Sequence, residues 1–148
     1  MKMEPRLEFA KVSPETYQAM LTVSRYTSEC GLEHSLLELV KTRASQINGC
    51  AYCIQMHTRD ARKLGETEER LHLLPAWRET EIYTPRERAA LAWTEALTLL
   101  TEGHAPDGVY AEVKAQFSEA EIAKLTLAIG VINSWNRIAV GLRFVPRP

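Results

Sequence analysis

The chain has 148 residues, of which 45% are hydrophobic and 25% charged, and its formal net charge is −1 with histidine neutral. This length fits one domain with its own core, and the balanced charge argues against nucleic-acid or anionic-membrane partners, which favour a basic excess. No apolar run reaches the roughly 18 residues of a membrane span, and the N-terminus lacks the apolar segment of a secretory signal. We therefore expect a cytoplasmic protein.

Helix signals dominate the first half of the chain. Ser13-Pro14 reads as an N-cap followed by Pro at the first helical position, and Gly31 is a matching end signal. Asn48-Gly49 predicts a tight turn. Further along the chain, Pro75 is expected to end a short helix that precedes it. The helices predicted for this half cover residues 14–28, 34–47, 50–64 and 68–74.

Two helix starts in the second half carry capping boxes, one in Thr84-Pro85-Arg86-Glu87 and one in Ser118-Glu119-Ala120-Glu121. The helices predicted here cover residues 84–101, 107–115 and 119–142. No segment has the period-two pattern of a strand. The sequence therefore predicts an all-α single domain over residues 1–148, a bundle of six or seven helices. Residues 1–12 and 145–148 are expected to be an extended arm and tail.

Cysteine and histidine spacing marks one segment for chemistry. Three cysteines in a chain without an export signal argue against a disulfide-stapled scaffold. Cys50, Cys53 and His57 are spaced three and four residues apart, so they share one face of the third helix, with Cys50 at its start. The turn before Cys50 predicts an antiparallel hairpin. At about 1.5 Å per residue, Glu38 and His57 would both lie about 12–15 Å from that turn.

These residue types suit a redox-active dithiol. A thiol attacks only as the thiolate, which His57 can generate as a base while Glu38 orients the imidazole and relays a proton. Attack on a peroxide gives a sulfenic acid, which the second cysteine converts to a disulfide, and an external dithiol can reduce that disulfide. The residues alone do not decide which cysteine attacks the peroxide. The helix N-terminus favours Cys50 as the reactive thiol, and adjacency to His57 favours Cys53.

Three other interpretations remain open on these residues. The two cysteines could be buried structural thiols, or they could bind a metal ion together with His57 and Glu38. The pair could also act as a general dithiol–disulfide oxidoreductase on protein substrates. Lys41, three residues after Glu38, would compete with His57 for its carboxylate.

The pattern resembles the alkylhydroperoxidase D-like branch of the carboxymuconolactone decarboxylase superfamily. The residues that carry the resemblance are Glu38, Cys50, Cys53, His57, Ala61 and Gly65, within a similarity over residues 32–143. The resemblance implies an all-helical fold, a homo-oligomer (trimer or hexamer, with a dimer possible), and peroxidase activity on hydrogen peroxide or organic hydroperoxides. It implies neither a cofactor nor a metal. The decarboxylase branch lacks the dithiol, so lactone decarboxylation is not expected.

The resemblance also implies a role for each residue. Cys53 would be the peroxidatic cysteine and Cys50 the resolving one, with His57 as base and Glu38 as proton relay. Tyr52 stands where characterised relatives carry a second relay histidine, and a phenol is a poor proton acceptor at neutral pH. Tyr52 and Trp135 are expected to line the substrate groove. The reductant would be a dithiol from a carrier protein or a lipoyl-type donor.

Two further groups of residues have expected places outside this set. Cys30, near the end of the first predicted helix, is expected to be a packing or surface thiol. Asn133, Asn136 and Arg137 interrupt the apolar last helix. They are expected at helix ends or interfaces, with a site contact as the alternative.

Overall fold

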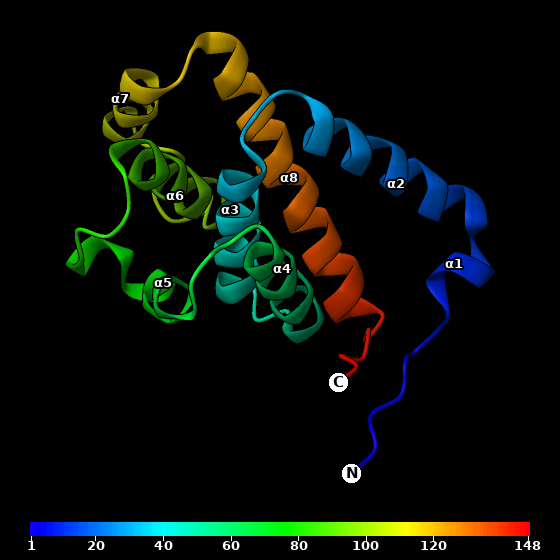
Figure 1. The fold of residues 1–148 in the computed structure, drawn as a ribbon. Coiled ribbons are helices and arrows are strands. Elements are labelled where there is room, and N and C mark those ends of the chain that lie inside the picture. Colours follow the sequence, from blue (N-terminus) through cyan, green and yellow to red (C-terminus); the bar gives the residue numbers. More distant parts are fainter.

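The computed structural model describes residues 1–148, which form eight α-helices, one 3₁₀ helix and no strand (Figure 1). The all-α prediction is confirmed. The helices are α1 (Phe9–Val12), α2 (Pro14–Glu29), α3 (His34–Ile47), α4 (Ala51–Lys63), α5 (Glu68–Leu73), η1 (Leu74–Glu79), α6 (Pro85–Thr98), α7 (Asp107–Gln116) and α8 (Glu119–Gly141). The seven helices α2 to α8 correspond to the seven predicted segments.

Helix starts follow the local signals of the sequence. At the start of α6, the Glu87 N–H donates to Thr84 Oγ1 at 3.2 Å, and the Thr84 N–H donates to Glu87 Oε2 at 2.8 Å. Ser118 and Glu121 make the same reciprocal pair at the start of α8. Side chains thus satisfy backbone donors that have no partner within the helix, which fixes where each helix begins.

The prediction for the N-terminal arm is wrong. The arm is not extended throughout, because Phe9–Val12 closes one helical turn, with the Lys11 and Val12 N–H groups donating to the Glu8 carbonyl at 2.9 Å. The short helix α5 ends at Leu73, before Pro75 as predicted, and a 3₁₀ helix, η1, follows it. Proline is tolerated at the start of η1, since there it lacks only a donor that would have no partner.

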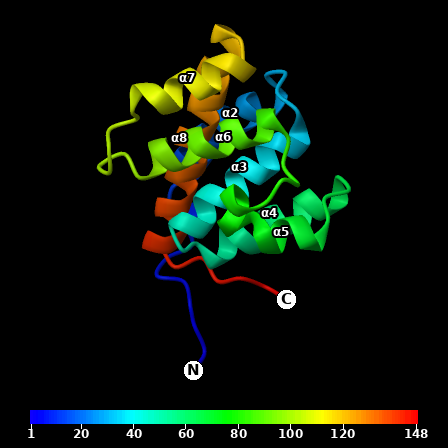
Figure 2. The ribbon, with the colours of Figure 1, turned by 90° about the vertical axis from the view of Figure 1, so that its left-hand side faces the viewer.

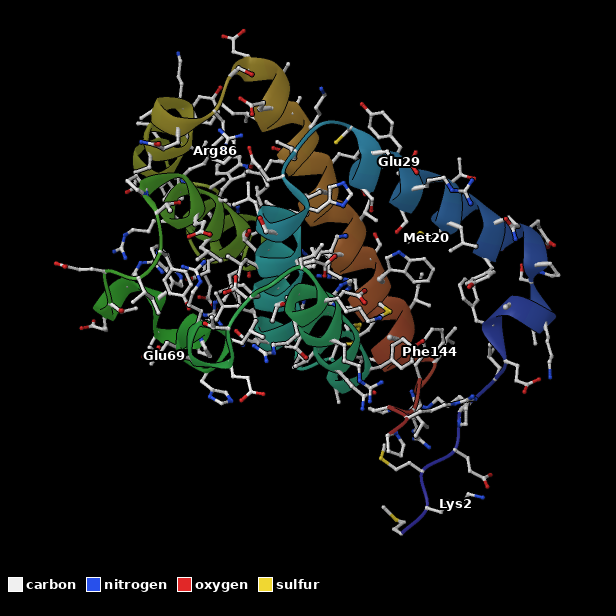
Figure 3. All side chains as sticks on the ribbon, viewed as in Figure 1. Lys2, Met20, Glu29, Glu69, Arg86 and Phe144 are labelled. Carbon is white, nitrogen blue, oxygen red and sulfur yellow. A yellow bond between two sulfur atoms is a disulfide. The ribbon has the colours of Figure 1, made fainter.

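α3 is the central helix of the bundle and packs against α4, α6 and α8 (Figure 2). Its apolar side chains are buried in two adjoining clusters, one shared with α6, α7 and α8 and the other with α4, α5, η1 and α6. Arg86 of α6, labelled in Figure 3, adds a polar clamp by bonding both Glu33 at the start of α3 and Glu121 of α8. α3 is therefore held on several sides, which gives the side chains it presents fixed positions.

α2 lies along α8 on the other side of the molecule, and both termini lie near the end of α8 (Figure 1). The N-terminal arm is tied to that end, since the Arg6 N–H donates to the Leu142 carbonyl at 3.0 Å and its guanidinium donates to the Gly141 carbonyl at 2.9 Å. No helix has the length and hydropathy needed to cross a membrane.

Candidate active site

The turn between α3 and α4 sets the position of the dithiol. Gly49 adopts a φ of +64°, a left-handed conformation that favours glycine. The Asn48 side-chain amide donates to Asn133 Oδ1 and Asn136 Oδ1 of α8, each at 2.9 Å. Asn136, 1% exposed, in turn donates to Ser45 Oγ of α3 at 3.0 Å. Because buried amides need partners, this network fixes the hairpin turn on α8.

Cys50 and Cys53 form a disulfide at the start of α4. Cys50 is the N-cap residue, and its Sγ accepts a hydrogen bond from the Cys53 N–H at 3.3 Å. The residues are 1% and 2% exposed and pack against Ala139 of α8. A sulfur in the N-cap position lies at the positive end of the helix dipole, which stabilises negative charge on it.

Glu38 of α3 and His57 of α4 form a buried pair across the hairpin, with Glu38 Oε2 2.9 Å from His57 Nδ1. The other carboxylate oxygen accepts from Lys41 Nζ at 3.3 Å. Burial by itself would raise the pKa of Glu38, but the hydrogen bond from His57 and the charge of Lys41 outweigh it and hold this pKa below its ordinary value. Since an ionised carboxylate only accepts, Nδ1 of His57 is the protonated nitrogen and Nε2 is left as the basic one.

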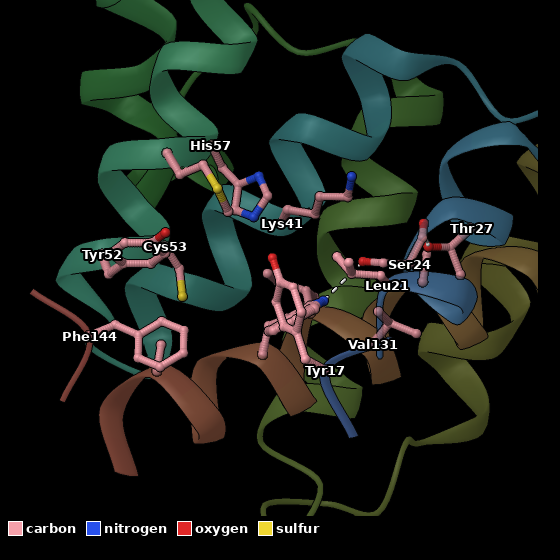
Figure 4. Close-up of a pocket in the computed structure, with 15 residues that line it drawn as sticks. Tyr17, Leu21, Ser24, Thr27, Lys41, Tyr52, Cys53, His57, Val131 and Phe144 are labelled. Atoms are coloured by element: carbon pink, nitrogen blue, oxygen red, sulfur yellow. Dashed lines mark hydrogen bonds between the residues drawn. The ribbon is translucent and has the colours of Figure 1, made fainter. Parts of the chain in front are cut away.

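A cavity of about 230 Å³ lies beside Cys53 (Figure 4). Cys53 and His57 line it and Cys50 does not, so the two sulfurs differ in what can reach them. The other lining residues are Tyr17, Leu21, Ser24, Thr27, Lys41, Tyr52, Met56, Ala128, Val131, Ile132, Trp135, Ala139 and Phe144.

Aromatic side chains from distant segments cover the cavity. The Tyr17 ring of α2 packs edge-on against Trp135 of α8, with centroids 6.2 Å apart. Phe144, beyond α8, packs edge-on against Tyr52 at 5.3 Å and also contacts Phe9 of α1 at 6.4 Å. These edge-to-face contacts hold the cover in place.

The structure brings together the four residues expected to carry chemistry: Glu38, Cys50, Cys53 and His57. Tyr52 and Trp135, the residues expected in a substrate groove, both line this cavity. No hydrogen bond joins His57 to either sulfur, so a proton passing between them needs a bridging water or a rearrangement of the side chains. Cys30 is a free thiol outside the cavity lining.

The metal set considered from the sequence is not assembled. Both cysteine sulfurs are taken up by the disulfide, and the potential ligand atoms that cluster are those of Glu38, His57 and Asp60. Asp60 pairs with Lys63 at 3.6 Å.

Sequence reasoning missed three features of the site. Lys41 and His57 do not compete for Glu38, because each bonds a different carboxylate oxygen. Tyr17 and Phe144 gave no local signal for their place in the cavity. For Asn136, a contact at the site was only the alternative to a place at a helix end or interface. The signal that could have found its contact with the turn was a pair of amides on an apolar helix face, which must find polar partners if buried.

The fold and the hairpin-borne dithiol place this chain in the carboxymuconolactone decarboxylase family, which it matches over residues 14–96, and within it in the alkylhydroperoxidase D-like branch. It is 42% identical over 140 residues to the uncharacterized protein YdfG of Bacillus subtilis, with 95% of each chain covered. A protein of unknown function from Agrobacterium tumefaciens, provisionally designated antioxidant defence protein AhpD, has a solved structure that is 45% identical. That structure superposes with a TM-score of 0.96 over 98% of this chain and 99% of its own.

A more distant structure shares the fold. An uncharacterized peroxidase-related protein from Silicibacter sp. TM1040 is 20% identical, with a TM-score of 0.80 over 90% of this chain and 71% of that one.

Proposed function

We propose that this protein is a thiol-dependent peroxidase that reduces hydrogen peroxide or organic hydroperoxides by cycling Cys53 and Cys50 between dithiol and disulfide. One observation carries the proposal: Cys53 lines an apolar cavity together with His57, whose second ring nitrogen is held by the ionised Glu38. The general antioxidant and peroxidase-related character of the structural relatives agrees with this reading.

The cycle starts from the reduced protein. His57 Nε2 takes the proton of the Cys53 thiol, directly or through a water. The thiolate attacks the terminal peroxide oxygen, so that an S–O bond forms, the O–O bond breaks and the two electrons of the thiolate sulfur reduce the peroxide. The leaving alkoxide takes the proton from His57 and departs as an alcohol. Glu38 stabilises the imidazolium formed in between.

The second half of the cycle closes the disulfide. The Cys50 thiol gives up its proton as its sulfur attacks the Cys53 sulfenic acid, the S–S bond forms, and the hydroxyl takes that proton and leaves as water. A thiolate of an external dithiol then attacks Cys53, which lines the cavity, forms a mixed disulfide with it and expels Cys50 as a thiolate. The N–H of Cys53 stabilises that leaving group. The second thiol of the donor attacks the donor sulfur of that mixed disulfide, which releases Cys53 and leaves the donor as a disulfide.

Burial of the dithiol favours a small substrate over a protein disulfide. Both cysteines are at most 2% exposed, so a folded protein surface cannot reach either sulfur. A slender dithiol, such as a lipoyl arm, could enter by the cavity. The family resemblance also predicts a homo-oligomer, which sedimentation of the purified protein tests.

Peroxide consumption in the presence of a small dithiol tests the function. The Cys53→Ser variant should lose turnover, and Cys30→Ser, which changes a thiol outside the cavity, should retain it. In the Cys50→Ser variant, a sulfenic acid trap should label Cys53. Unchanged turnover in Cys53→Ser would refute the proposal.

The metal-binding alternative has its own readout. Elemental analysis of protein purified without a metal-affinity tag should find no stoichiometric zinc, and the reduced thiols should react with an alkylating agent. Zinc near one equivalent that protects both thiols would favour a metal-binding or redox-sensing protein without turnover.

A further inference from the structure

The cavity beside Cys53 has one charged side chain that the peroxidase cycle leaves without a direct task. Lys41 is the only lysine or arginine among the fifteen lining residues, and neither aspartate nor glutamate lines the cavity. Its side chain is 16% exposed, and its ammonium has one protein acceptor, Glu38 Oε1 at 3.3 Å. Because an ammonium carries three N–H donors, two of them remain available to a molecule in the cavity.

Two hydroxyl groups add further donors to the lining. Ser24 Oγ accepts from Trp135 Nε1 at 2.9 Å, which leaves the hydroxyl hydrogen of Ser24 free to donate. The Tyr17 hydroxyl has no hydrogen-bond partner in the protein. In Figure 4, Cys53 lies toward one end of the cavity and Ser24 toward the other, with the Lys41 side chain extending between them. The lining therefore offers N–H and O–H donors from Lys41, Tyr17 and Ser24, and the Lys41 ammonium carries its positive charge in an ion pair with Glu38, which does not itself line the cavity.

The rest of the cavity limits the size and polarity of what it can hold. Eleven of the fifteen lining residues are hydrophobic, among them Leu21, Val131 and Ile132. The volume of about 230 Å³ is below the roughly 300–1,000 Å³ of common ligand pockets. A compact molecule with one ring or a short chain suits this space, and a long acyl chain does not.

We propose that the preferred substrates are compact organic hydroperoxides that carry a carboxylate, and that Lys41 determines this specificity. The Lys41 ammonium would bind the carboxylate by charge-assisted hydrogen bonds, which are strong in a partly buried site. The apolar body would occupy the middle of the cavity, with the peroxide group at Cys53. This inference rests on the proposed peroxidase function and adds a substrate class to it.

The carboxylate takes no part in the redox step. Cys53 Sγ bonds the terminal oxygen, the O–O bond breaks, and the hydroxy-acid product leaves with the proton from His57. The external dithiol supplies the two electrons that restore the cysteine pair.

Two matched substrates test the specificity: cumene hydroperoxide, which is neutral, and its 4-carboxylate derivative. The measured quantity is the ratio of kcat/KM for the carboxylate substrate to that for the neutral one. Because Lys41 also bonds Glu38, the Lys41→Met variant could lose activity on every substrate, and the ratio cancels that common loss. We expect a ratio above one in the wild type, a fall of about tenfold or more in Lys41→Met, and retention within about threefold in Lys41→Arg.

Binding gives a second readout without turnover. The alcohol product of the carboxylate substrate should bind the oxidised wild-type protein at least about tenfold more tightly than it binds oxidised Lys41→Met, as measured by calorimetry. A protein that consumes both hydroperoxides with a ratio near one, unchanged in Lys41→Met, overturns the specificity and leaves the peroxidase proposal standing. A protein that consumes neither hydroperoxide, nor hydrogen peroxide, overturns both.

Discussion

Two of the walls that enclose the cavity are held by different kinds of contact, and α8 supplies further lining residues. The wall that α3 and α4 supply presents Lys41, Cys53 and His57, and this chemical wall is held by short polar contacts to Glu38 and by the disulfide. The covering wall presents Tyr17, Leu21 and Phe144 from α2 and the C-terminal segment. It is held by contacts between aromatic rings, together with hydrogen bonds from Trp135 Nε1 to Ser24 Oγ at 2.9 Å and from the Phe144 N–H to the Ala139 carbonyl at 2.7 Å.

The difference separates two requirements of a catalyst. Directional hydrogen bonds to Glu38 orient Lys41 and His57 in the chemical wall, and proton transfer depends on the orientation of the base. Aromatic contacts allow a range of ring distances and angles, so the covering wall can vary with the substrate while the chemistry stays in place. Substitutions on the two walls should therefore affect different kinetic constants.

Removal of the base from the chemical wall should have the largest effect. Gln in place of His57 keeps a polar side chain and removes the proton acceptor, so kcat/KM for every hydroperoxide should fall by about 10²–10⁴-fold. The same change at His72, an exposed residue of α5, serves as the control and should leave the rate unchanged. A His57→Gln enzyme that retained wild-type kcat/KM would show that this imidazole takes no part.

The helices and the chemical wall could be predicted from the sequence because their signals are local. Capping boxes at Thr84 and Ser118 mark helix starts within four residues. The spacing of Cys50, Cys53 and His57 places them on one helix face, and a single tight turn relates that face to α3. The positions of these side chains in space follow from such a pattern with few further assumptions.

The covering wall could not be predicted in this way. Tyr17 meets Trp135, and Tyr52 meets Phe144, across separations of about ninety residues or more. Apolar periodicity shows which face of a helix is buried and leaves open which segment covers it. The short helix α1 could not be predicted either, since one helical turn has too few residues to show a helical period of apolar side chains.

Substitution on the covering wall should have a smaller effect, and on a different constant. Phe144→Ala removes the edge-on contact with Tyr52, and aromatic pairs of this kind contribute about 0.5–1.5 kcal/mol. We expect KM for cumene hydroperoxide to rise by roughly 2- to 12-fold, with most of the effect in KM and little in kcat. Tyr26→Ala, a change to an aromatic residue of α2 that is 52% exposed, provides the control. A fall confined to kcat would argue that Phe144 takes part in the chemistry.

The smallest predicted effect is on the free energy of unfolding, and it concerns Glu38, which holds the chemical wall. The pKa of Glu38 lies below its unfolded value of 4.5, because the contacts with His57 and Lys41 outweigh the opposing effect of burial. A lowered folded pKa gives stability that is present above the unfolded pKa and is lost as the pH falls through the folded one. The difference in unfolding free energy between the wild type and Glu38→Gln should therefore shrink as the pH falls from about 5 to about 3.

Urea unfolding of the two oxidised proteins across this pH range measures that difference, and other carboxylates cancel because both proteins contain them. The magnitude is modest because burial of the carboxylate offsets much of what its partners contribute. A difference that stays constant, or grows, as Glu38 is protonated would mean that the carboxylate is not held ionised. His57 Nδ1 would then lack the acceptor that directs its Nε2 to act as the base.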